Sequence, residues 1–199
     1  PLTTNNSAIL NYADLLKCAM DKQGVRFCYA GSCVVTVGEF NDRVRSLGNK
    51  SIVLFNICAR LISGLRSNFK GNVSLIVDKQ GGRNTYSNLL RDRLSLTDIK
   101  VLKESNKIST YVVADAERKM VVSFVEKGED TSMATALASM FSKYVRELFM
   151  RLENEYWLQF MPDLKPTAGY YTDAQRFLAQ IAHVKKKEAI QDSILIRIK

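Results

Sequence analysis

The chain reads, from residue 73 to residue 86, Val73-Ser-Leu-Ile-Val-Asp78-Lys-Gln-Gly81-Gly82-Arg83-Asn-Thr-Tyr86. The first five residues are mostly apolar and a glycine pair follows, so the run predicts a buried strand that ends at Asp78. An acid at the end of such a strand lies at the edge of an α/β sheet, where ligands bind. Asp78 is therefore a candidate metal ligand and Arg83 a candidate phosphate contact. A role for Asp78 as the cap of the following helix explains the pattern equally well.

Composition places the chain among globular proteins with a basic balance. Its 199 residues are 46% hydrophobic and 25% charged, enough for one domain with a real core, and the net charge of +9 favours polyanionic partners. Four cysteines without CxxC spacing and a single histidine argue against a zinc site and for a reduced, cytoplasmic protein. No apolar run is long enough to cross a membrane. The polar start without an initiator Met indicates a piece of a longer protein.

Helical and extended patterns alternate, which predicts an α/β class and a single domain over residues 1–199. Helices are predicted over 8–22, 49–69, 132–158 and 172–187, with a short helix through Leu89-Leu90. Strands are predicted over 25–30, 33–38, 73–78, 99–103, 109–114 and 119–125. The first two would form a hairpin, and residues 115–119 a turn between the last two. The tail at 188–199 is either a strand or a segment that docks on a partner.

Carboxylates are the main candidates for catalysis, because the only histidine, His183, lies in a Lys-rich helix and no nucleotide-binding loop motif occurs. A second acid cluster, Glu126-Lys-Gly-Glu129-Asp130, precedes the long helix. It can supply a ligand acid, although a cap at Asp130 or Thr131 is the slightly favoured alternative.

Two further segments carry basic and aromatic side chains. Ser139 and Lys143 share one face of the long helix and can both reach a phosphate, although small residues there also permit close packing. The segment Lys165-Pro-Thr-Ala-Gly-Tyr170-Tyr-Thr172-Asp places two tyrosines before a helix. Such rings stack on a sugar or base; alternatively one is buried, one is exposed, and Thr172 is the cap.

These elements, in this order, resemble the type 2 ribonuclease H family. Residues 127–150, which read KGEDTSMATALASMFSKYVRELFM, look like that family's KGD, a short spacer and AASI-x-AK-x-x-R-x-x-x-M. Residues 169–172 look like the G-Y-x-T part of its K-G-Y-x-T pattern; Ala168 stands in place of the lysine, for which Lys165 is a loose substitute. Residues 77–86 resemble a divergent branch of the family. The resemblance covers roughly residues 50–182.

The resemblance implies a ribonuclease H-like mixed sheet flanked by helices, and cleavage of RNA in RNA–DNA hybrids. Four acids would bind two divalent ions, Mg²⁺ or Mn²⁺. Asp78 takes the place of the third acid and Glu129 that of the fourth, or Asp130 if the register slips. Tyr170 takes the place of the tyrosine that senses the ribonucleotide junction. The implied substrate contacts are Arg83, Asn84, Tyr86, Ser139, Lys143, Arg146, Lys165 and Tyr170.

The family's first two acids lie in an Asp-Glu-Ala-Gly strand, and this chain has no such motif. Either the chain is a piece without its first strand, or it is a catalytically inactive homologue that binds RNA or a hybrid, or serves in an assembly. An Asp-Glu pair upstream in the parent protein would distinguish these. A basic scaffold for a protein partner is a third alternative, and it predicts no salt-dependent binding of nucleic acid.

Overall fold

The computed structural model describes residues 5–94, 98–114 and 119–198, and the chain divides into two compact units at Gly31. The first unit contains α1 (Asn6–Lys22), which confirms the helix predicted over 8–22. Asn5 begins α1 because its side chain accepts a hydrogen bond from the Ser7 N–H at 3.1 Å.

The hairpin predicted over 25–30 and 33–38 is wrong. Residues 25–36, all of them described, form no strand, and the chain enters α2 (Val37–Leu47) instead. Thr36 caps this helix, since its hydroxyl oxygen accepts from the Glu39 N–H at 3.3 Å. The Thr-x-x-Glu spacing is a helix-start signal that competes with the apolar run before it.

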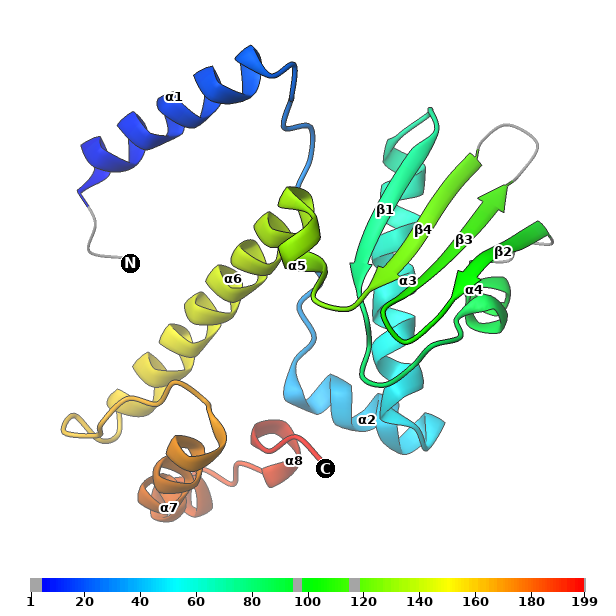
Figure 1. Ribbon diagram of the computed structural model, residues 1–199. Helices are drawn as coiled ribbons and strands as arrows, with labels where there is room; N and C mark the ends of the chain where they lie inside the picture. Colours follow the sequence, from blue (N-terminus) through cyan, green and yellow to red (C-terminus); the bar gives the residue numbers. More distant parts are fainter. Residues whose placement is uncertain (1–4, 95–97, 115–118, 199) are drawn as a thin grey trace. The chain divides into compact units, whose positions relative to one another are not determined.

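The second unit is built around a mixed sheet of four strands in the order β1-β4-β3-β2 (Figure 1). Their bounds are Val73–Asp78 for β1, Asp98–Glu104 for β2, Ile108–Ala114 for β3 and Lys119–Val125 for β4. β1 runs parallel to β4, and the other two pairs are antiparallel. The last four predicted strands are thereby confirmed. The turn predicted at 115–119 lies outside the described residues, apart from Lys119.

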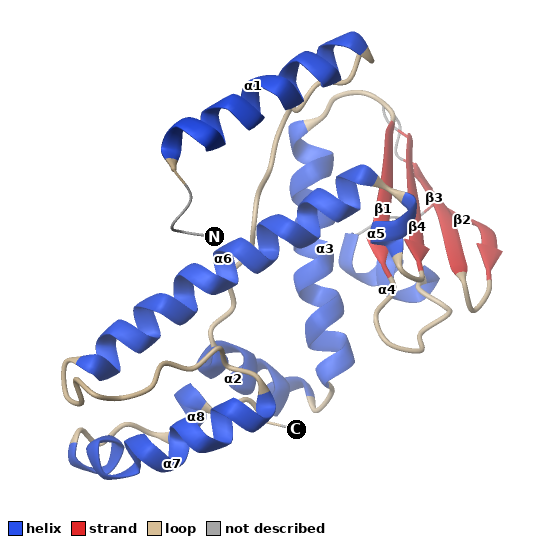
Figure 2. Ribbon diagram, turned by 60° about the vertical axis from the view of Figure 1, so that its left-hand side comes forward, coloured by secondary structure: helices blue, strands red, loops and turns tan. Residues whose placement is uncertain are grey.

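Two helices cover one face of this sheet and form the main core with it (Figure 2). They are α3 (Lys50–Asn68) and α4 (Ser87–Leu94), which confirms both predicted helices. The Asn49 side chain caps α3 by accepting from the N–H groups of Ser51 and Ile52. Along β3 and β4 buried residues alternate with half-buried or exposed ones, because only one face of the sheet packs against these helices.

The long helix starts beside the sheet. A single turn, α5 (Gly128–Thr131), is followed by α6 (Met133–Leu158), which confirms the helix predicted over 132–158. Its cap is Ser132, whose hydroxyl accepts from the Thr135 N–H, so neither Asp130 nor Thr131 caps it. The Thr135 hydroxyl donates to the carbonyl of Ile76 in β1 at 3.3 Å and ties the start of α6 to the sheet.

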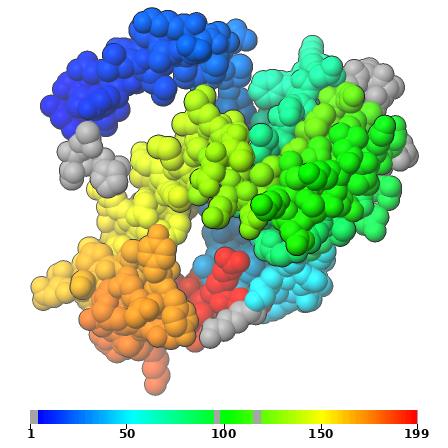
Figure 3. Space-filling view, in the orientation of Figure 1, coloured from blue at the N-terminus to red at the C-terminus, as the bar shows by residue number. Residues whose placement is uncertain are grey.

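The C-terminal helices form a second core with the end of α6. α7 (Tyr171–Lys187) confirms the last predicted helix, with Thr172 inside it instead of capping it. A short helix, α8 (Asp192–Leu195), follows in the tail. The tail docks within its own chain on α2 (Figure 3). There the Asn41 side chain donates to the carbonyls of Ser193 and Ile196 and accepts from the Ile198 N–H.

Candidate functional site

A cleft of about 530 Å³ opens where the parallel strands β1 and β4 end. Their last residues, Asp78 and Val125, are paired across the sheet, so the loops that leave them start side by side. Ligands of α/β sheets bind at the carboxyl ends of the strands, which makes this edge the natural place for a site. The cleft is lined by Asp78, Lys79, Gly81, Gly82, Asn84, Asn106, Glu126, Lys127 and Glu129.

Asp78 combines a capping role with a place in the cleft. Its Oδ1 accepts a hydrogen bond from the Gly128 N–H at 2.9 Å. Gly128 is the first residue of α5, so Asp78 caps that helix and not α4, the helix that follows it in sequence. A carboxylate is favourable at this position because it accepts from an N–H at the start of the turn that no helical carbonyl can pair with. The bond also brings the loop after β4 against the end of β1.

Two acids of the second cluster, Glu126 and Glu129, line the cleft, and Glu129 is the one that the family resemblance assigns to metal binding. It lies one residue after Gly128, so the hydrogen bond from Gly128 to Asp78 carries it to the same place. Asp130 is exposed and stands outside the described lining of the cleft. Asp78 and Glu129, 51 positions apart, thus line one cavity, as two acids of a shared metal site must.

The cleft contains some, but not all, of the ligand atoms that a hard divalent cation needs. Carboxylates such as those of Asp78, Glu126 and Glu129 are the oxygen ligands that Mg²⁺ and Mn²⁺ prefer, whereas the amide oxygen of Asn84 already accepts a hydrogen bond from the Lys79 ammonium. Within the described ranges, however, no three His, Cys, Asp or Glu side chains group closely enough to hold a metal ion. The cleft is therefore lined by three carboxylates, those of Asp78, Glu126 and Glu129, but the described residues do not form a complete ligand set.

The glycine turn after β1 is held by Lys79. Its ammonium donates to the Asn84 side chain at 2.9 Å and to the Ser105 carbonyl at 2.5 Å. Asn84 in turn donates to the Asn106 side chain at 2.7 Å, which brings the β2–β3 turn to the cleft. Nothing in the sequence points to Asn106, because an Asn in a short polar turn has no distinctive spacing to Asp78.

Arg83 and Tyr86 turn away from the cleft. The Arg83 guanidinium donates to the Ser51 hydroxyl at the start of α3, and Arg83 is absent from the described lining of the cleft. Tyr86 has no exposed surface, and its ring stacks on Phe124 at a centroid distance of 3.7 Å. The expectation that Tyr86 contacts substrate is therefore corrected: it is a core residue whose hydroxyl accepts from the Gln80 N–H. Burial raises the pKa of Tyr86.

A second group of predicted residues meets where α6 passes the segment before α7. The Arg146 guanidinium lies 4.8 Å from the centroid of the Tyr170 ring and donates to the Ala168 carbonyl. Gly169 between them has φ of +73°, and a Cβ there would lie 3.2 Å from Arg146 Nη2. The positive φ favours glycine at this position, and any larger residue would also have to displace the Arg146 or Met150 side chain. Tyr170 is 67% exposed, so the Arg146–Tyr170 pair faces solvent.

The remaining predicted contacts lie along the same helix or beside it. Ser139 is half-buried and Lys143 exposed, one turn apart on α6, and Lys165 is exposed. Eleven residues separate Thr135, which contacts β1, from Arg146, a rise of roughly 16 Å along the helix. The structure thus divides the predicted site into two groups: the cleft with Asp78 and Glu129, and the Arg146–Tyr170 pair.

Comparison of the chain with protein-family models, with curated proteins and with solved structures finds no match. In the part of the chain that the structure describes, no helix has both the length and the apolar character needed to cross a membrane.

Proposed function

We propose that this chain is a ribonuclease H-like domain that acts on the RNA strand of RNA–DNA hybrids. The observation that carries the proposal is the cleft at the end of β1 and β4, where Asp78 and Glu129 come together from distant parts of the chain. These are the two acids that the family resemblance assigns to metal binding. A divalent cation held there, Mg²⁺ or Mn²⁺, would supply activation of water and stabilisation of the leaving oxygen.

The chain's own residues have separate roles in this proposal. Asp78 and Glu129 hold the cation, and the hydrogen bond from the Gly128 N–H to Asp78 holds the segment that carries Glu129 against the end of β1. Tyr170 stacks near the sugar of the ribonucleotide, with its hydroxyl close to the 2′-OH, the group that distinguishes RNA from DNA. Arg146 and Lys143 contact phosphates, and the net charge of +9 attracts the polyanion.

The metal-binding part is tested with Mn²⁺, whose free form gives an electron paramagnetic resonance signal. We expect Asp78→Asn and Glu129→Gln to bind Mn²⁺ at least tenfold more weakly than the wild type, since each removes a charged ligand that the proposal assigns to the cation. Asp130→Asn is the matched control, because it removes a neighbouring exposed acid outside the described lining of the cleft. If all three variants lose the same amount of Mn²⁺ affinity, the loss reflects the change of net charge and not the removal of a ligand, and the assignment of the two ligands is wrong.

A second candidate is a non-catalytic module that binds hybrid or RNA. It is favoured because, within the described ranges, no three His, Cys, Asp or Glu side chains are close enough together to hold a metal ion. Incubation of the chain with a labelled hybrid and Mg²⁺ separates the two candidates. Metal-dependent cleavage lost in Asp78→Asn supports the nuclease. Binding of hybrid above duplex DNA without cleavage supports the module, and equal binding of both duplexes contradicts both.

A further inference from the structure

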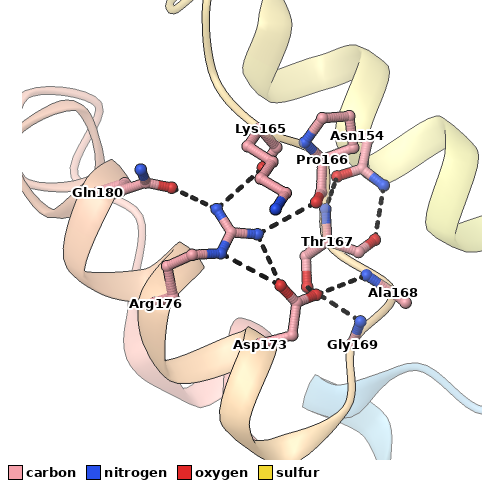
Figure 4. Close-up of polar contacts among 9 residues, drawn as sticks. All are labelled: Asn154, Lys165, Pro166, Thr167, Ala168, Gly169, Asp173, Arg176 and Gln180. Atoms are coloured by element: carbon pink, nitrogen blue, oxygen red, sulfur yellow. Dashed lines mark hydrogen bonds and ion pairs between the residues drawn. The ribbon is translucent and has the colours of Figure 1, made fainter.

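The segment between α6 and α7 is held by a polar network from both helices (Figure 4). On the α6 side, Asn154 forms a pair of bonds with one backbone residue. Its amide nitrogen donates to the Thr167 carbonyl at 2.8 Å, and its amide oxygen accepts from the Thr167 N–H at 2.8 Å. The same nitrogen donates to the Met150 carbonyl at 2.8 Å. Asn154 therefore holds the backbone of Thr167 directly against α6.

On the α7 side, Asp173 and Arg176 complete the network. Asp173 Oδ2 accepts from the Thr167 hydroxyl at 2.6 Å and from the Ala168 N–H at 2.8 Å. Arg176 donates to Asp173 Oδ1 at 2.7 Å and to the carbonyls of Lys165 and Pro166. The hydrogen bonds from Thr167 and Arg176 lower the pKa of Asp173 to about 2, so its carboxylate is charged at neutral pH.

These bonds converge on a short stretch whose outer residues are exposed. Thr167 is buried, whereas Ala168, Gly169 and Tyr170 are exposed. The network therefore orders a stretch of backbone that contributes little apolar burial of its own. Ordering a backbone residue costs about 1–2 kcal/mol, and a binding loop that is ordered beforehand does not incur this cost on association.

We infer that Asn154, Asp173 and Arg176 are positioning residues that hold the backbone of 165–169 so that Tyr170 stands over Arg146, preorganised for the ribonucleotide sugar. The inference rests on the proposed function, in which Tyr170 discriminates hybrid from DNA. The role of Asn154 is the easiest to test, because Asn154 forms two hydrogen bonds with the segment and one with α6, and it is far from Tyr170 in sequence.

The decisive variant is Asn154→Asp, which keeps the shape of the side chain but replaces two donated bonds with repulsion between a carboxylate and two carbonyls. Gln159→Glu is the matched control: it makes the same amide-to-acid change, and hence the same change of charge, at an exposed position after the same helix. Asp173→Asn is a second variant on the other side of the network. Trp157, the only tryptophan and buried in the second core, reports by fluorescence whether α6 and α7 remain packed.

Two measurements are made on the full chain. The first is the ratio of affinities for an RNA–DNA hybrid and a DNA duplex, from fluorescence anisotropy. The second is the rate of chymotrypsin cleavage at the exposed bond between Tyr170 and Tyr171, which requires a mobile backbone and no nucleic acid. With Trp157 fluorescence unchanged, we expect Asn154→Asp to lower the affinity ratio roughly two- to tenfold, as loss of one hydrogen bond to substrate would, and to accelerate cleavage. Asp173→Asn should change both in the same direction.

Comparison with the control variant, the wild type and Tyr170→Phe shows whether the positioning role or the proposed role of Tyr170 is wrong. Gln159→Glu should weaken binding of both duplexes equally and leave the cleavage rate unchanged. If Tyr170→Phe lowers the wild-type affinity ratio but Asn154→Asp and Asp173→Asn do not, the positioning role is wrong and the proposed function stands. If the wild type shows no preference for hybrid, or Tyr170→Phe leaves it unchanged, the role of Tyr170 is wrong and the positioning inference is overturned with it.

Discussion

Asp78 is expected to serve both the fold and the metal, and two substitutions separate these roles. Asp78→Asn keeps an oxygen that can accept the hydrogen bond from the Gly128 N–H, now 2.9 Å from Oδ1, but removes the charge. Asp78→Ala removes the acceptor as well and leaves the N–H of a buried glycine without this partner. Both variants lose the negative charge that would bind the cation, so the metal effect should be shared and the stability effect should differ.

The stability difference follows from the hydrogen bond. Bonds to charged groups contribute about 1.5–3 kcal/mol and bonds between neutral groups about 0.5–1.5 kcal/mol, so Asp78→Asn should lower the free energy of unfolding by about 1 kcal/mol. Asp78→Ala should lower it by about 1.5–3 kcal/mol, because the charged bond is lost and not replaced. Urea unfolding in EDTA, followed by far-ultraviolet circular dichroism, measures both values.

The metal effect is read from the same unfolding curves with Mn²⁺ added. At a free Mn²⁺ concentration of a hundred times its Kd, binding to the native state alone raises the free energy of unfolding by about 2.7 kcal/mol. We expect this increase in the wild type and a much smaller one in both variants. The reasoning is refuted if Mn²⁺ stabilises Asp78→Asn as much as the wild type, or if the two variants are equally stable in EDTA.

Three further expectations concern other parts of the chain. Tyr86→Phe should lower the free energy of unfolding by about 1–3 kcal/mol, because the Gln80 N–H loses its acceptor, while the affinity for hybrid in an anisotropy titration stays unchanged. Lys143→Ala should reduce the slope of log affinity against log salt by about one unit; an unchanged slope across a salt series would show that Lys143 contacts no phosphate. The Asp173 pKa of about 2 lies below its ordinary value, so the stabilisation by Asp173 is complete above about pH 4 and is lost as the pH falls toward 2. Urea unfolding followed by Trp157 fluorescence should show this loss in the wild type and a weaker pH dependence in Asp173→Asn.

Local patterns predicted most of the secondary structure of this chain. The strand at 73–78 and the helix capped by Asn49 follow from residues adjacent in sequence, because strand alternation, helical spacing and caps are short-range interactions. The failed hairpin at 25–38 shows the limit of such patterns. An apolar run forms a strand only where another strand pairs with it, and the Thr36 cap begins a helix within the predicted second strand.

Pairing across the fold decided the candidate site. The sequence by itself determined that acids follow two apolar strands, at Asp78 and near Glu129. Only the parallel pairing of β1 with β4 and the bond from Gly128 to Asp78 brought those acids to one cleft. Tyr86 lies in the core instead, because its ring stacks on Phe124, although the family resemblance implied that it contacts substrate. Short-range preferences determine each helix and strand. Burial and strand pairing determine which side chains come together, and both depend on residues far apart in the chain.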